Sequence, residues 1–268
     1  MDLSNELRYK DNSSCLFKEG NGIQNQEDLY LTFKNDLRKT KGKLVLNARS
    51  SSWFSHLYNE FTKGFGSYYN KWVRQQKKRP ASELEKWADE QYIPLTISVK
   101  TTNGWKEINK LKTIGPLLNR EVVIPLEIPA SEQVEVKVSS GYMFWELDYA
   151  AIDYSDDVDF LVKEIKPFEA INEKGINVLP ELEFADKKFL VQPTIGDSTI
   201  LKYKSIVAKT GMAQTFFLHT SGYYEHPRNH TGTPKLAFLK SFKRPGAMSV
   251  FSKQKFFEAW NNLATAKN

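Results

Sequence analysis

An acidic run near the middle of the chain has the spacing of a calcium-binding loop. Counted from Asp153, oxygen-bearing side chains fall at positions 1, 3, 5, 7 and 12 of that loop: Asp153, Ser155, Asp157, Asp159 and Glu164. The sixth position must turn sharply and calls for glycine, and Val158 stands there. We therefore interpret the run as an exposed acidic loop. A looser calcium site at Asp153, Asp157, Asp159 and Glu164 is the alternative, and no other cofactor is expected.

Three histidines late in the chain could form a second metal site. His219, His226 and His230 lie within twelve residues of one another, and imidazole is a common ligand of zinc. Pro227 stops a regular helix from carrying both His226 and His230, so the usual helical pair of ligands is not available. A site assembled on a loop remains as an alternative.

Residues for nucleophilic catalysis are present singly but not as a complete set. Ile195 to Thr199 (IGDST) resembles the Gly-Asp-Ser block of a serine hydrolase family, whose mechanism needs a histidine oriented by a carboxylate. No aspartate follows Asp197, so we interpret the block as a turn between strands. Cys15 is the only cysteine, which excludes an internal disulfide and a cysteine-based zinc site. We do not assign a catalytic residue.

Aromatic residues provide a candidate binding surface. Tyr142, Trp145, Tyr223 and Tyr224 could stack on sugars or bases. Aromatic side chains on strands more often belong to the core. These four residues are therefore binding candidates whose exposure decides their role.

The elements that must position these residues alternate between two periodicities. Alternating apolar and polar residues predict strands over 28–34, 43–48, 93–101, 121–128, 133–140 and 143–155, and further strands over 189–195, 199–209 and 213–221. Helical spacing predicts a helical insertion over about 50–92, interrupted at Gly64–Gly66, and a docking C-terminal helix over 252–266. We expect a serine N-cap for the first helix and a capping box at Ser82 and Glu85 for the third. The fold class is thus an antiparallel β-sandwich in one domain over residues 1–268.

Alternation along 143–155 places Asp148 on one face with Phe144 and Glu146. A covered carboxylate needs a hydrogen-bond donor or a cation, because burying the charge alone is unfavourable. We expect Asp148 to be structural and to pair with Arg49. Asp153, Asp156, Asp157 and Asp159 are expected on an exposed rim, since they are too crowded to be buried together without a metal.

The charge of the chain is unevenly distributed. Residues 145–200 carry 5 basic and 13 acidic groups, whereas residues 201–268 carry 11 and 2. A basic tail is compatible with a phosphate-bearing partner, but no nucleic-acid motif accompanies it. The chain also has no apolar run of the length that spans a membrane. A solvated basic face is the preferred interpretation.

Several motifs together resemble the C-terminal, β-rich region of large uncharacterised bacterial proteins of the cell envelope. They are the Asn-Ala-Arg start of an aromatic helix (47–49), the strand motif Trp145-Glu-Leu-Asp-Tyr149, and the Phe-Leu-x-x-x-Gly-Tyr-Tyr strand (217–224). The resemblance spans about residues 43–245 and carries no assigned activity. It implies a module of a larger exported or envelope-associated protein from a Bacteroidota-like host.

Three functions follow as hypotheses. The first is a non-catalytic interaction or structural module whose helical insertion and 219–230 loop contact a protein partner. The second is a carbohydrate-binding or carbohydrate-active module, and the third is a basic nucleic-acid-binding protein. We expect an envelope location if the chain is a fragment and a cytoplasmic one if Met1 is native.

Overall fold

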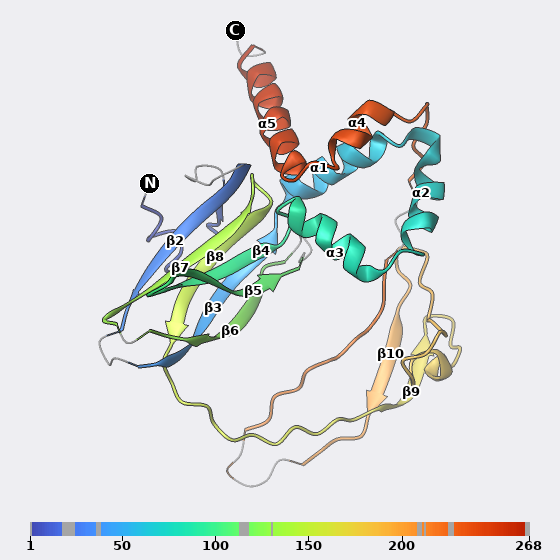
Figure 1. The fold of residues 1–268 in the computed structure, drawn as a ribbon. Coiled ribbons are helices and arrows are strands. Elements are labelled where there is room, and N and C mark those ends of the chain that lie inside the picture. The colour runs from blue at the N-terminus through green and yellow to red at the C-terminus, as the bar shows by residue number, and fades with distance from the viewer. Residues whose placement is uncertain are drawn as a thin grey trace. The chain divides into compact units, whose positions relative to one another are not determined.

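The chain forms antiparallel β-sheets accompanied by helices, as the sequence predicts (Figure 1). The computed structural model describes residues 2–17, 25–35, 39–112, 118–129, 131–207, 211, 213–224 and 228–265, with the backbone alone for 263–265. Contacts divide the chain into two compact units, residues 1–156 with 227–268 and residues 157–226. The single domain over residues 1–268 stays a prediction.

The larger unit contains two four-stranded sheets. The first has the order β1 (Cys15–Leu16), β8 (Trp145–Asp153), β3 (Lys41–Ser50) and β6 (Arg120–Glu127). The second has the order β2 (Gln26–Lys34), β7 (Gln133–Gly141), β4 (Leu95–Thr101) and β5 (Gly104–Leu111). Neighbouring strands in both sheets are antiparallel.

One apolar core joins the two sheets. Every second residue is buried over 44–48 of β3 and 134–138 of β7, and these residues belong to a single cluster: Leu44, Leu46, Ala48, Val134, Val136 and Val138. This is the period of two that places alternate side chains on one face of a strand. The two sheets therefore form the predicted sandwich, with the core between them.

The predicted helical insertion consists of α1 (Ser52–Lys63), the 3-10 turn η2 (Gly66–Tyr68), α2 (Tyr69–Gln76) and α3 (Ala81–Glu90). The hydroxyl of Ser51 caps α1 by accepting from the amide of Phe54 at 2.9 Å, so the predicted serine cap is confirmed. The predicted capping box is wrong. Pro80 is the N-cap of α3, and no side-chain hydrogen bond caps this helix.

The helices pack together through aromatic side chains. Phe61 of α1 is buried and makes ring contacts with five other aromatic residues: Tyr58, Phe65, Trp72, Trp87 and Phe242. Their ring centroids lie 4.8–6.4 Å from that of Phe61, which is the range of favourable aromatic pairs. Because Phe242 follows α4 (Leu236–Ser241), this cluster connects the insertion to the C-terminal segment.

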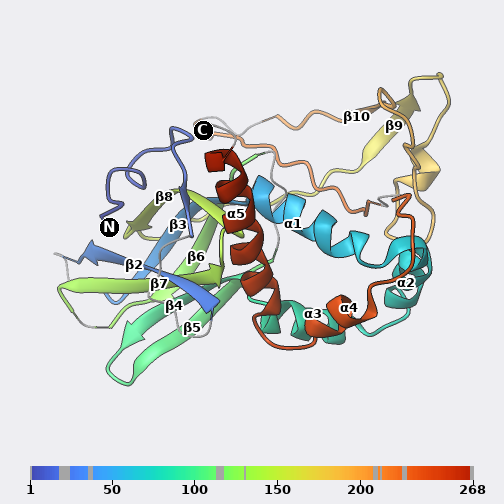
Figure 2. The same cartoon turned by 90° about the horizontal axis from the view of Figure 1, so that it is seen from above.

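The last helix, α5 (Ala247–Thr265), lies beside α1 at the end of the sandwich (Figure 2). Two buried serines fix it: Ser249 Oγ accepts from the Tyr142 amide at 2.9 Å, and Ser252 Oγ donates to the Tyr142 carbonyl at 2.7 Å. The sequence predicts docking through an apolar stripe that consists of Phe256, Phe257, Trp260, Leu263 and Ala264. Phe257 and Trp260 of that stripe are instead 55% and 62% exposed. Phe256 of the same stripe packs edge-on against Tyr142 and Trp53, with ring centroids 5.8 and 5.9 Å apart, so the helix docks from its start as far as Phe256.

The smaller unit contains β9 (Pro167–Asn172), the 3-10 turn η3 (Leu179–Glu181) and β10 (Thr199–Tyr203). The two strands pair antiparallel, with Thr199 opposite Asn172. The predicted strands over 189–195 and 213–221 are wrong, because the described residues there have no regular secondary structure. The predicted strand over 199–209 is observed only up to Tyr203. A two-stranded ribbon of this kind is marginal by itself.

Within the part of the chain that the structure describes, no helix combines the length and the apolar character needed to cross a membrane.

Candidate interaction surface

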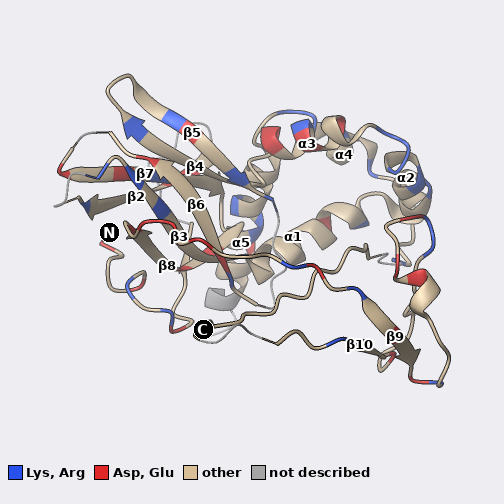
Figure 3. Cartoon of the chain, turned by 90° about the horizontal axis from the view of Figure 1, so that it is seen from below, with Lys and Arg blue, Asp and Glu red and all other residues tan. Residues whose placement is uncertain are grey.

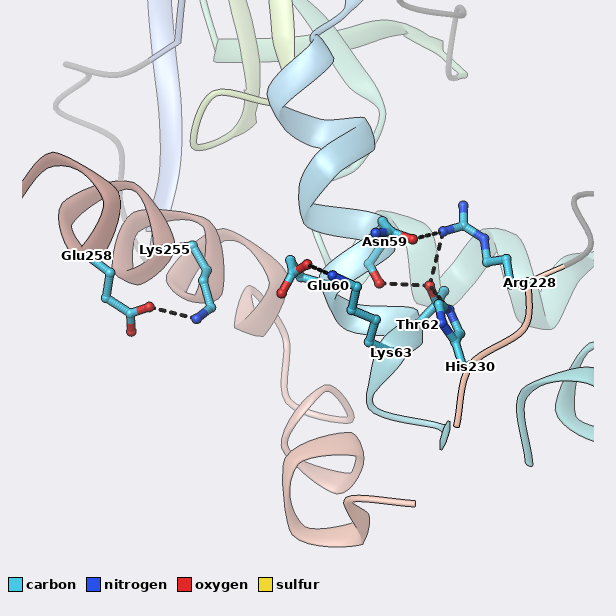
Figure 4. Close-up of polar contacts among 8 residues, drawn as sticks. All are labelled: Asn59, Glu60, Thr62, Lys63, Arg228, His230, Lys255 and Glu258. Carbon is cyan, nitrogen blue, oxygen red and sulfur yellow. Dashed lines mark hydrogen bonds and ion pairs between the residues drawn. The ribbon is translucent and has the colours of Figure 1, made fainter. Parts of the chain in front are cut away.

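A polar cluster lies where the segment 228–230 meets α1 (Figure 4). The guanidinium of Arg228 donates from Nη1 to Asn59 Oδ1, and the same nitrogen is 3.4 Å from the hydroxyl of Thr62. The ring of His230 lies with Nε2 3.2 Å from that hydroxyl. Asn59 and Thr62 are three residues apart on the helix, so they present both acceptors on one face. We call these four residues the Arg228 cluster.

The backbone of the following segment holds this cluster against the end of α1. The amide of Ser67 donates to the carbonyl of Gly232 at 3.0 Å, and the amide of Lys235 donates to that of Gly64 at 2.8 Å. Gly66 has a φ of +51°, and a Cβ at this position would lie 2.2 Å from the Gly232 oxygen. Glycine is therefore required here both by conformation and by space.

The Arg228 cluster is electropositive. Burial lowers the pKa of His230, and the charges of Arg228 and Lys63 lower it further. Lys63 is paired with Glu60 at 2.5 Å. Among the described residues, no carboxylate lies within ion-pair distance of Arg228, whose contacts are to a neutral amide and a hydroxyl. A fixed guanidinium of this kind is suited to binding a carboxylate or phosphate.

The smaller unit exposes an unusual number of large apolar side chains. The exposed large apolar residues of this unit include Val158, Phe160, Leu161, Val162, Phe168, Phe184, Ile195, Val207, Phe216, Phe217, Leu218, Tyr223 and Tyr224. Among its described residues the buried apolar side chains are Ala170 and Val178. Contiguous exposed apolar surface usually marks an interaction site. We call residues 157–226 the apolar arm.

The four aromatic binding candidates divide into two pairs. Tyr142 and Trp145 are 4% and 1% exposed, so their proposed role in ligand stacking is wrong. Trp145 is a core residue whose indole donates to the Ile93 carbonyl at 2.8 Å. Tyr223 and Tyr224 are 61% and 91% exposed, and Tyr223 packs edge-on against Phe189 at 5.2 Å. The latter pair alone is accessible to a partner.

Asp148 is buried as expected, but its expected partner lies elsewhere. Arg49 donates to Glu146, with Nε and Nη2 at 2.7 and 2.6 Å from Oε2. The strand register explains this correction, because Arg49 stands directly opposite Glu146 on the neighbouring strand. Cross-strand partners interact most closely. The predicted Arg49–Asp148 pair is therefore replaced by an Arg49–Glu146 pair.

The acidic run beyond β8 is accessible to solvent. Asp156, Asp157, Asp159 and Glu164 are exposed, and Asp153 is partly exposed. The hydroxyl and the amide of Ser155 lower the pKa of Asp153 by hydrogen bonding. In the described ranges, no three His, Cys, Asp or Glu side chains gather in an arrangement that could hold a metal. The calcium alternative at this run remains a prediction.

The three histidines have separate places. His219 is exposed in the smaller unit, His230 belongs to the Arg228 cluster, and His226 lies outside the described residues. Burial raises the pKa of Cys15 to about 11, so its thiol stays protonated at neutral pH and is a poor nucleophile.

Arg228 is a candidate residue that was not predicted from the sequence. The signal was present, since this arginine lies between two histidines in a segment that follows an exposed aromatic stretch. Its acceptors on α1 could not be identified from sequence, because 169 residues separate Arg228 from Asn59. Basic residues are also frequent in α2 and the turn after it, where the ribbon is blue in Figure 3: Lys71, Arg74, Lys77, Lys78 and Arg79.

Comparison of this chain with protein-family models, with curated proteins and with solved structures finds no match.

Proposed function

We propose that the chain is a non-catalytic interaction module of a larger, envelope-associated bacterial assembly. The observation that carries the proposal is the apolar arm, which exposes most of its large apolar side chains. Burying such side chains contributes about 1.5–3 kcal/mol each. The exposed side chains of the apolar arm do not contribute this free energy in the isolated chain. A partner that covers the arm would bury them, and the complex would be stabilised.

The Arg228 cluster supplies a second, polar contact for such a partner. Its guanidinium is held by Asn59 and Thr62 before any partner arrives. Less side-chain entropy is therefore lost on binding than for a free arginine. Because neutral groups hold it, an acidic group on the partner would form an ion pair there. The Arg228 cluster therefore favours a partner that presents carboxylates.

The envelope location rests on the resemblance of the motifs at 47–49, 145–149 and 217–224 to the C-terminal regions of envelope proteins. A carbohydrate-binding function is less well supported. It relied on four aromatic rings, and Tyr142 and Trp145 are buried in the core. The nucleic-acid hypothesis has no additional support beyond the basic residues near α2.

A photo-crosslinking amino acid at position 217, in cells that produce the full chain, would test the proposal. Phe217 is 90% exposed, so the replacement leaves the packing of the described core unchanged. We expect a discrete crosslinked protein in the envelope fraction. The double variant Phe216→Ser/Phe217→Ser, with a crosslinker at position 207, should lose that product while its unfolding midpoint stays the same.

A crosslinker at position 123 is the matched control. Val123 is exposed on β6 of the larger unit, outside the apolar arm. Equal crosslinking from 123 and 217, or none from either, contradicts the proposal. A crosslinked product that runs at twice the mass of the chain would identify a second copy as the partner.

A further inference from the structure

Four buried side-chain oxygens near one bulge in β8 have no hydrogen-bond partner among the residues that the structure describes. They are Glu6 Oε2, Ser14 Oγ, Asn47 Oδ1 and Asp148 Oδ1. Native proteins leave few buried polar atoms unpaired, and each requires an explanation. The four residues come from separate parts of the chain. Strand pairing, together with a backbone hydrogen bond between Ala150 and Leu7, brings these parts to the same stretch of β8.

β8 forms a bulge where it pairs with β3, and Asp148 is the extra residue of that bulge. In the register between the two strands, Asn47 stands opposite Tyr149 and Ala48 opposite Leu147. Asp148 is left without an opposite residue, as expected of a bulge. Its backbone therefore lies next to that of Asn47, whose amide oxygen is one of the four.

The other edge of β8 brings the N-terminal segment to the same bulge. Cys15 stands opposite Leu147 and Leu16 opposite Glu146, so Ser14 is the next residue in line with Asp148. Further along, the amide of Ala150 donates to the carbonyl of Leu7 at 3.0 Å. Glu6 precedes Leu7, and its charge acts on the nearby Cys15 thiol.

The N-terminal segment also covers this part of the sheet. The ammonium of Lys10 lies 4.9 Å from the centre of the Tyr149 ring and pairs with Glu121 of β6. Asp148 is only 1% exposed beneath this cover. The nearby cations have other partners, because Arg49 pairs with Glu146 and Lys10 with Glu121. No ion pair or hydrogen bond of the described residues compensates the Asp148 carboxylate.

We propose that these oxygens bind a calcium ion, which fastens the N-terminal segment onto the first sheet. Carboxylates and an amide carbonyl are oxygen ligands that calcium prefers, and a hydroxyl can add a further oxygen. The two carboxylates, Glu6 and Asp148, balance the charge of one divalent ion. Calcium fits better than magnesium, because the oxygens are shielded from water and magnesium retains several of its own waters. This site is separate from the exposed acidic run.

Titration calorimetry of the full chain with calcium chloride, after removal of divalent ions with a chelator, tests the proposal. We expect one site per chain, and the thermal midpoint should rise as calcium is added. Asp148→Asn should weaken binding by at least about 100-fold, since loss of even an indirect metal contact costs about 10-fold to 100-fold. Glu6→Gln, on a partly exposed residue, gives a second variant if Asp148→Asn does not fold.

Asp157→Asn is the matched control, because it removes one carboxylate from the exposed run and leaves the bulge intact. Its calcium affinity should equal that of the wild-type chain. The proposal is overturned if the wild-type chain binds no calcium, or if Asp157→Asn loses binding while Glu6→Gln retains it. Tighter binding of magnesium than of calcium would also overturn it.

Discussion

The protonation of His230 reports on the charge of the Arg228 cluster. Burial, Arg228 and Lys63 all lower the pKa of this histidine, so the folded chain favours the neutral imidazole. The unfolded chain takes up the proton at a higher pH. Folding stability is therefore expected to decrease as the pH falls below the ordinary histidine pKa of about 6.5.

Arg228→Met should raise the pKa of His230, because one of the two nearby positive charges is removed while burial remains. Titration of the His230 ring proton by NMR measures this change. Lys255→Met removes the same charge from α5, where Lys255 pairs with Glu258 at 2.6 Å, and should leave the value unchanged. Equal pKa values for His230 in the two variants would show that Arg228 has no such influence.

At this scale the sequence identified residue classes better than it identified partners. The burial of Asp148 follows from the alternation of β8, but its relation to Arg49 depends on the register of two strands. A bulge after Asn47 shifts that register by one residue, and the sequence has no local signal for it. The exposure of Tyr223 and the burial of Trp145 likewise depend on tertiary packing.

Among the elements, the break after α1 is sensitive to substitution at Gly66. Gly66→Ala should destabilise the larger unit by about 2–4 kcal/mol. The alanine would keep a positive φ, and its Cβ would collide with the Gly232 carbonyl. Urea denaturation followed by tryptophan fluorescence measures the loss.

Gly222→Ala is the control for this substitution. No atom lies within 4 Å of the added Cβ there, so its free energy of unfolding should match the wild type. Similar losses for both variants would mean that general glycine effects, and not the contact with Gly232, determine the result.

The elements with a strong local signal were predicted well. The six predicted strands of the sandwich and the helices of the insertion have clear periods of 2 and 3.6, and the structure confirms them, whereas β1 and β5 of the two sheets were not predicted. Residues 189–195 and 213–221 have the composition of strands but no neighbouring strand in the structure to pair with. A strand needs a partner for its backbone groups, and composition alone does not provide one.

Across the whole molecule, stability should differ sharply between the two units. The larger unit has a continuous apolar core, whereas the described part of the apolar arm buries Ala170 and Val178. Segments with few buried apolar contacts open at low free-energy cost. We therefore expect the amides of residues 157–166 and 213–224 to exchange with deuterium far faster than those of β3 and β7.

Hydrogen exchange followed by mass spectrometry resolves these peptides. Protection of the apolar arm equal to that of β7 in the isolated chain would contradict the expectation. The crosslinked complex provides a second comparison, in which a partner that covers the arm should slow the exchange of these residues.

The two buried serines of α5 have a consequence for how the protein is made. They bond to the backbone of Tyr142, which precedes Ser249 by 107 residues in the chain. A ribosome adding about 5–20 residues per second takes about 5–20 s to cover that distance. During this interval α5 has not yet been synthesised, so the end of the sandwich at Tyr142 is exposed to solvent. A chaperone that binds this exposed end would act before translation finishes. A truncated message would yield a chain without α5, in which this end of the sandwich stays exposed.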